Sequence, residues 1–146
     1  GVEAEKRGEA SAIAKCIYEM FNLKVPILSI LIGEGGSGGA LGLAVANEVW
    51  AMENSTYSIL SPEGFASILW KNEKRAKEAA NLMKMTAKDL LDLGVIEKIL
   101  PEGNEASEFK VITDFLQVQI LDFIYNMSLK NEDEIVASRE TRFRSF

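Results

Sequence analysis

A glycine-rich stretch at residues 32–40 constrains the fold of this chain more than any other feature. It holds five of the eleven glycines and reads Ile-Gly-Glu-Gly-Gly-Ser-Gly-Gly-Ala. An apolar run precedes it, and a run of small residues follows it. Glycine permits unusual backbone angles and lets another group approach its N–H. The stretch therefore predicts a strand, a glycine turn and a helix, with a group carrying negative charge at the turn.

Length and composition limit the class of protein. A chain of 146 residues is long enough for one domain with a hydrophobic core. The net charge of −6 argues against a nucleic-acid partner, and no apolar run approaches the roughly 18 residues of a membrane span. Cys16 is the only cysteine, which excludes an internal disulfide and a cysteine-based zinc site. We therefore expect a cytoplasmic protein that binds neither metal nor membrane.

The absence of histidine is the most informative count. Histidine is the usual general base of hydrolases and a common metal ligand. A serine–histidine triad is therefore unavailable within this chain. Lysine or carboxylate bases remain open but are rarer.

Apolar spacing and turn residues predict an α/β fold with short strands, flanking helices and a long C-terminal helix. The expected helices are residues 3–22, 40–46, 63–70, 71–85, 87–93 and 105–129, and the expected strands are 26–32, 48–52, 56–60 and 95–100. The run 26–32 is almost wholly apolar, which is typical of a strand buried in a parallel sheet. We expect the tail, with Arg139, Arg142 and Arg144, to be solvated and partly disordered.

The residue pattern of the glycine stretch matches a dinucleotide-binding fingerprint. Gly33, Gly35 and Gly38 satisfy G-x-G-x-x-G, and Glu53 stands near the place of a ribose-binding acid. Only fifteen residues separate Gly38 from Glu53, which leaves little room for a full helix and turn. A nucleotide-binding module remains an alternative of a different class.

A second match is the nucleophile elbow of serine hydrolases, G-x-S-x-G, with Ser37 at its centre. A serine hydroxyl without an activating base is a poor nucleophile at neutral pH. Its structural role would be a turn hydroxyl or a helix N-cap. Catalysis by Ser37 is therefore disfavoured.

The third interpretation is an oxyanion hole built from backbone N–H groups, which needs no catalytic side chain. Gly38 and Gly39 lie at the junction with the expected helix, where their N–H groups are best placed. The interpretation predicts that the reactive base comes from a cofactor or a substrate.

Several segments together resemble one family, the α subunit of the carboxyltransferase of multisubunit bacterial acetyl-CoA carboxylase. The resemblance rests on the glycine stretch, on Ser55-Thr56-Tyr57-Ser58 and on the block that begins Ser61-Pro62-Glu63-Gly64. Segments 4–8 and 85–96 are similar as well. The combination of the glycine stretch with the Ser-Pro-Glu-Gly block is far more specific than either motif.

The resemblance implies a crotonase-like fold (a ββα superhelix) and a transferase. It implies transfer of a carboxyl group from carboxybiotin, on a separate carrier protein, to acetyl-CoA, forming malonyl-CoA for fatty acid synthesis. It assigns Gly38 and Gly39 to the oxyanion hole for the biotin ureido oxygen, and Gly35, Gly36 and Ser37 to cofactor binding.

The implied partners are a carboxyltransferase β subunit in an α2β2 heterotetramer, the biotin carboxyl carrier protein and biotin carboxylase. We expect residues 1–146 to be a single crotonase-like domain that lacks its N-terminal part, with an unpaired sheet edge and no activity without the β subunit. Glutamine is usual in the family where Glu9 stands. Another acyl-CoA carboxyltransferase, a decarboxylase subunit of the same fold and a non-catalytic scaffold remain alternatives.

Overall fold

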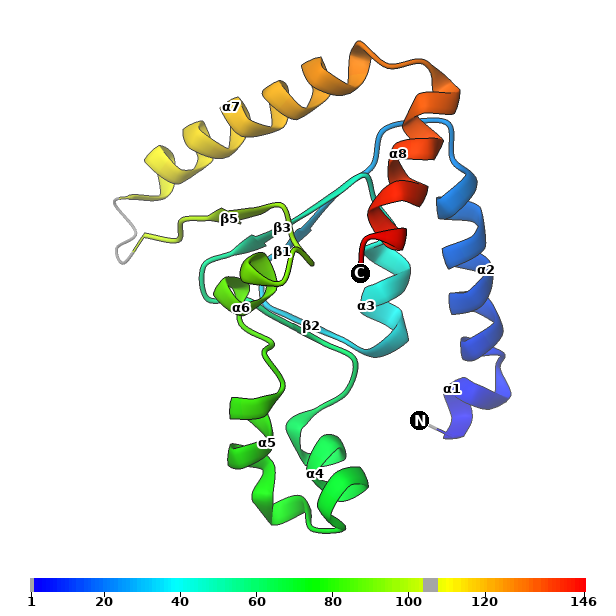
Figure 1. Cartoon of the computed structure of the whole chain (residues 1–146), viewed down its shortest axis with the longest axis vertical. Helices are drawn as coiled ribbons and strands as arrows, with labels where there is room; N and C mark the ends of the chain where they lie inside the picture. The colour runs from blue at the N-terminus through cyan, green and yellow to red at the C-terminus, as the bar shows by residue number, and fades with distance from the viewer. Residues whose placement is uncertain (1, 104–107) are drawn as a thin grey trace.

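The computed structural model describes residues 2–103 and 108–146 (Figure 1). The helices are α1 (Val2–Lys6), α2 (Glu9–Asn22), α3 (Ser37–Leu43), α4 (Pro62–Trp70), α5 (Ala76–Leu82), α6 (Ala87–Asp92), α7 (Phe109–Ser128) and α8 (Glu132–Arg144), with a 3-10 turn, η1, at Glu73–Arg75. The strands are β1 (Leu28–Leu31), β2 (Glu34–Gly36), β3 (Glu48–Met52), β4 (Thr56–Ser58) and β5 (Lys98–Leu100). The predicted α/β class is confirmed.

Two small parallel sheets form the centre of the fold. The larger has the order β1-β3-β5, with Leu28 opposite Glu48 and Trp50 opposite Lys98. The smaller pairs β2 with β4, with Gly35 opposite Tyr57. Strand β2 was not expected, because three residues with two glycines carry no alternating apolar pattern. The glycine stretch is thus partly a strand and not only a turn.

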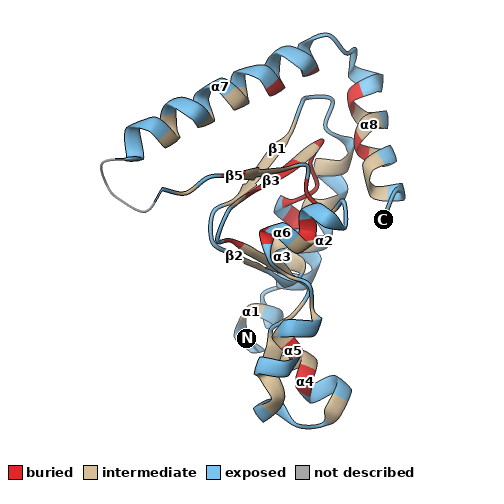
Figure 2. Cartoon of the chain, turned by 60° about the vertical axis from the view of Figure 1, so that its left-hand side comes forward, coloured by how far each residue is buried: buried red, intermediate tan, exposed pale blue. Residues whose placement is uncertain are grey.

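The larger sheet has a hydrophobic core on each face, because alternate side chains of β3 point to opposite sides. Val49 and Ala51 join Ala46, Leu90 and Ile96 on one face. On the other face, Trp50 and Leu100 pack against Phe123 and Met127 of α7. Figure 2 shows the buried residues gathered along these strands and on the adjoining sides of the helices. The strand predicted at 26–32 is β1 and the sheet is parallel, but β1 is only half-buried, and the strand buried on both faces is β3.

Helix boundaries differ from the prediction where glycine or backbone geometry intervenes. The helix expected at 3–22 is broken by Gly8, whose φ of 85° lies in the left-handed region. The expected helix 71–85 is a 3-10 turn followed by α5. Residues 105–107 of the expected long helix lie outside the described residues, and α7 ends at Ser128. Among the described residues, no helix is long and apolar enough to cross a membrane.

The predicted solvated tail is wrong, because residues 132–144 form α8, a helix packed on the body. Asn131 and Glu134 make a capping box at its start. Arg139 is fully buried, and its Nη1 donates hydrogen bonds to carbonyls near the end of α2, those of Met20, Phe21 and Leu23, at 2.8–2.9 Å. The last carbonyls of a helix lack partners within it. Arg139 supplies those partners.

Helices α4 and α5 form a hairpin that projects from the sheets (Figures 1 and 2). The Ser61 side chain accepts a hydrogen bond from the Gly64 N–H at 3.1 Å, so the predicted N-cap is confirmed. The two helices pack on each other and bury Ala66 and Ala79. The guanidinium of Arg75 lies 3.9 Å from the centre of the Trp70 ring.

Candidate functional site

The glycine turn joins β2 to α3 through an abrupt change of backbone direction. Gly36 is extended, with φ −138°, and the next residue, Ser37, has φ 61°. A left-handed serine is uncommon and costs free energy. No side chain caps α3, so the first-turn N–H groups, including those of Gly38 and Gly39, have neither an intrahelical partner nor a side-chain partner.

A cavity of about 650 Å³ opens beside this turn, and we call it the glycine pocket. Its floor and walls come from α3, β4, the α4–α5 hairpin and α6. It is lined by Ser37, Gly38, Leu41, Tyr57, Ser58, Ile59, Phe65, Met83, Lys84, Leu90, Leu93 and Val95. Most of these side chains are apolar, and only Tyr57 and Lys84 can ionise. A compact apolar group with one hydrogen-bonding oxygen matches such a lining.

The structure divides the five predicted site residues between two sides of the turn. Ser37 and Gly38 line the glycine pocket. Gly39 is exposed, and a Cβ added there would meet nothing within 4 Å. Gly35 and Gly36 line a different cavity, of about 430 Å³. Of the predicted pair, Gly38 lines the glycine pocket and Gly39 does not, and Gly35 and Gly36 line the other cavity.

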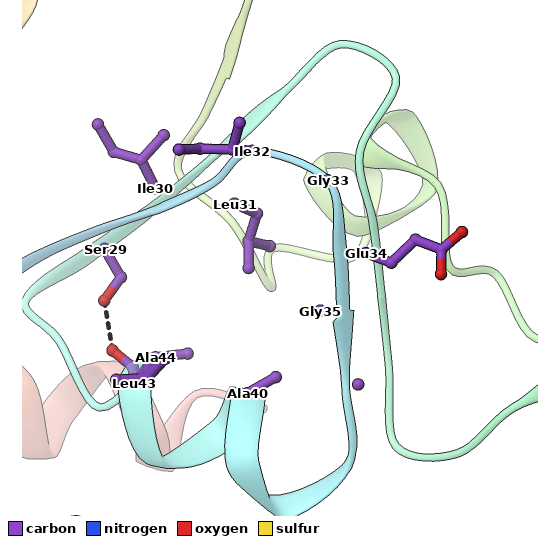
Figure 3. A pocket seen from close by; sticks show the side chains of 11 residues that line it. Ser29, Ile30, Leu31, Ile32, Gly33, Glu34, Gly35, Ala40, Leu43 and Ala44 are labelled. Carbon is purple, nitrogen blue, oxygen red and sulfur yellow. Dashed lines mark hydrogen bonds between the residues drawn. The ribbon is translucent and has the colours of Figure 1, made fainter.

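The second cavity lies between α3 and the neighbouring strands β1 and β2 (Figure 3). Within the described residues, β1 is one of the two edge strands of its sheet, and β2 is an edge strand of the two-stranded sheet. The Ser29 hydroxyl donates a hydrogen bond to the Leu43 carbonyl across this cavity. Ile32, which also lines it, is 78% exposed.

Gly35 is needed for packing. A Cβ at this position would lie 3.1 Å from Leu31 Cδ2 and 3.3 Å from Tyr57 Cδ2. Both distances are shorter than ordinary carbon–carbon contacts. Glycine at this position therefore lets the Tyr57 ring lie directly on the β2 backbone.

Two of the residues with left-handed backbone in the described chain border the glycine pocket. Ser37 and Lys84 line it, and both have positive φ. The Lys84 Nζ lies 3.5 Å from Asp89 Oδ1. Hydrogen bonding from the Thr86 hydroxyl is the main cause that lowers the pKa of Asp89, with the Lys84 charge acting in the same direction. Strained backbone concentrates at functional sites.

Tyr57 is the pocket residue that sequence reasoning missed. It belongs to a segment used for the family resemblance, but it received no role of its own. Burial raises the pKa of its phenol, and the Arg142 charge opposes this effect. The sequence gives only an indirect signal for Tyr57, since an aromatic residue in a short strand is as typical of the hydrophobic core as of a pocket.

The described residues contain no group of three or more histidine, cysteine, aspartate or glutamate side chains that could hold a metal ion. None of the residues that line the glycine pocket is an acid or a histidine. The site consists of backbone donors and apolar walls, which can stabilise an oxyanion and exclude water.

Comparison with solved structures defines the class of this fold. One similar structure is transcarboxylase 12S, with a TM-score of 0.73 and 17% identity, over 90% of this chain and 25% of that chain. Another is a Pseudomonas malonate decarboxylase hetero-tetramer, with a TM-score of 0.72 and 16% identity, over 99% of this chain and 59% of that chain. The fold is that of the crotonase-like carboxyltransferases, as the resemblance implied.

The whole chain, residues 1–146, matches the family model "Acetyl co-enzyme A carboxylase carboxyltransferase-like", and the chain belongs to that family. Relatives named acetyl-coenzyme A carboxylase carboxyl transferase subunit alpha are similar to it. The Clostridium acetobutylicum protein is 51% identical over 146 residues, which are 99% of this chain and 53% of the relative. A Streptococcus pyogenes protein is 52% identical over 147 residues, which are 100% of this chain and 56% of the relative. The chain thus spans about half the length of the curated relatives it matches.

Proposed function

We propose that this chain forms part of the α subunit of a carboxyltransferase that moves a carboxyl group from carboxybiotin to acetyl-CoA and yields malonyl-CoA. Family membership and the names of relatives about half identical in sequence support the reaction. The observation that carries the assignment of the site is the Gly38 backbone, which opens onto an apolar pocket without any acid or histidine. The dinucleotide and serine-hydrolase alternatives gain no support from the comparisons.

In this proposal, the N–H groups of Gly38 and Gly39 donate hydrogen bonds to the ureido oxygen of biotin. Helix α3 has only seven residues, so the donors act as individual N–H groups and not through a long helix dipole. Each such donor is worth about 2.7–4 kcal/mol in a transition state. Bound there, carboxybiotin would supply the carboxyl group and a ring nitrogen able to act as the base, and no histidine or acid of this chain lines the pocket.

The apolar walls of the glycine pocket fit the body of a bicyclic ring. Leu41, Phe65 and Leu90 give this side an apolar lining. Ser37 is one of the polar residues that line the pocket and is a candidate for a polar contact with the cofactor. Gly35 and Gly36 support the turn from its other side and do not line the pocket.

The proposed partners follow from what the pocket lacks. We propose that a β subunit completes the site and contributes the groups that bind the acetyl thioester. The biotin carboxyl carrier protein delivers carboxybiotin, and biotin carboxylase recharges it. The extensive uncovered surface of β1, β2 and α7, where Ile32, Phe109 and Val118 are all more than 60% exposed, is consistent with a larger assembly.

The test blocks access to these two N–H groups by substitution, in the full-length protein assembled with its β subunit. Gly38→Val and Gly39→Val place branched side chains beside the two N–H groups, and we expect kcat to fall about 100-fold, as for loss of one donor. Gly38→Ala and Gly39→Ala are the controls. An added Cβ at Gly38 meets only Ile13 Cγ2, at an ordinary 3.6 Å, and at Gly39 it meets open space.

Circular dichroism and the assembly state show whether each variant folds. Folded, assembled valine variants with normal malonyl-CoA formation would remove the proposed role of these two residues. A loss of activity in the valine variants, with normal activity in the alanine controls, supports the proposed role.

A further inference from the structure

A thin wall separates the glycine pocket from a smaller cavity of about 250 Å³ under the end of α8. Leu41, Tyr57 and Val95 line both cavities. Tyr57 has the largest side chain of the three. Its ring therefore has the most influence on how deep the glycine pocket is.

The backbone of Tyr57 is fixed on both sides. Its N–H donates a hydrogen bond to the Met85 carbonyl at 3.0 Å. In the β2–β4 sheet it lies opposite Gly35, and a Cβ there would come 3.3 Å from its ring. The missing side chain of Gly35 therefore provides the space in which the ring lies.

Interactions of Arg142 fix the side of the smaller cavity that lies away from the glycine pocket. Arg142 Nε lies 2.6 Å from Glu97 Oε1, and its Nη2 donates to the Val95 carbonyl at 2.5 Å. The same guanidinium lies 5.2 Å from the Phe143 ring centre and 5.1 Å from that of Phe146. The Phe143 and Phe146 rings stack edge to face at 5.8 Å. Space behind Tyr57 is thus preserved and mostly apolar.

We propose that Tyr57 is a specificity-determining residue that closes the glycine pocket against the cavity behind it and so limits the size of the substrate group bound beside Gly38. The inference rests on the proposed function and deepens it. The bound group is a compact apolar body. It is the ring system of biotin, as in the proposed function, and the experiment distinguishes it from the acyl chain of the CoA thioester.

The experiment uses the full-length chain assembled with its β subunit. Tyr57→Ala should join the two cavities. Tyr57→Leu removes less side-chain volume and is the second variant, in case the alanine variant does not fold. Tyr57→Phe is the matched control, because it keeps the ring and removes only the phenol oxygen. One arm compares kcat/KM for acetyl-, propionyl- and butyryl-CoA. The other compares biotin with the bulkier biotin sulfone in the reverse reaction from malonyl-CoA.

An opened variant is expected to raise the ratio of biotin sulfone to biotin at least tenfold, within the range by which a pocket discriminates small differences in size. A change confined to the acyl-CoA ratios would overturn the proposal, and Tyr57→Phe should leave all ratios unchanged. Unchanged ratios in both arms for folded, opened variants would overturn the role of Tyr57. The wild-type complex tests the proposed function separately, because its failure to form malonyl-CoA rejects that function whatever Tyr57 does.

Discussion

The glycines of the turn differ in their surroundings, and the residue pattern alone does not show this difference. Gly35 is surrounded by Leu31, Tyr57 and Ala40, whereas a Cβ at Gly33 would meet nothing within 4 Å. Gly38 adjoins the pocket and has ordinary space around it. The sequence located the turn and predicted Gly38 and Gly39 as donors, but it could not show which glycine is packed against other side chains. That distinction depends on side chains of β1 and β4, which come together only in the folded chain.

Substitution of Gly35 should therefore be costly where substitution of Gly33 is not. Gly35→Ala forces the new Cβ against Leu31 and Tyr57, and we expect a loss of about 1–3 kcal/mol in unfolding free energy, as for an overpacked core. Gly33→Ala is the matched control and should change stability by less than about 0.5 kcal/mol. Urea unfolding of both variants measures the difference. Equal stabilities would contradict the packing role of Gly35.

Among the elements, α8 is the one for which the prediction from sequence failed most clearly. Its arginines predicted a charged, solvated tail, yet Arg139 is fully buried. Its Nη2 donates hydrogen bonds to the Val25 carbonyl and to Asn47 Oδ1, each at 2.9 Å. These acceptors are more than ninety residues away in sequence, so no local periodicity could indicate them. Local signals did succeed at Ser61, where the cap and the helix are neighbours.

Removal of Arg139 should destabilise the protein strongly. Burial lowers the pKa of its guanidinium, but arginine stays charged in proteins, and backbone carbonyls provide most of its partners. Arg139→Met removes all five of these buried hydrogen bonds, and we expect a loss of about 3–5 kcal/mol in unfolding free energy, the range for breaking a buried charged contact.

The control for this prediction is Arg144→Met on the same helix. Arg144 makes an exposed ion pair with Glu140 four residues earlier, which is worth less than about 1 kcal/mol. Denaturant unfolding compares the two variants. A cost for Arg139→Met no larger than that for Arg144→Met would show that the hydrogen bonds of Arg139 do not hold α8 in place.

At the scale of the whole molecule, the resemblance predicted the crotonase-like fold and the chain's membership of its family. Physical patterns alone predicted only an α/β domain with a parallel sheet. Strand β2 escaped prediction because Glu34, Gly35 and Gly36 offer no apolar alternation. The glycine pocket also escaped it, since its walls come from segments between residues 37 and 95.

Reconstitution tests the central claim most directly. The full-length chain and its β subunit, purified separately, are assayed alone and together for malonyl-CoA formation from acetyl-CoA and carboxybiotin. Because the proposed function assigns the groups that bind the acetyl thioester to the β subunit, we predict turnover only in the mixture. Malonyl-CoA formation by this chain alone, or none by a correctly assembled complex, would contradict the account.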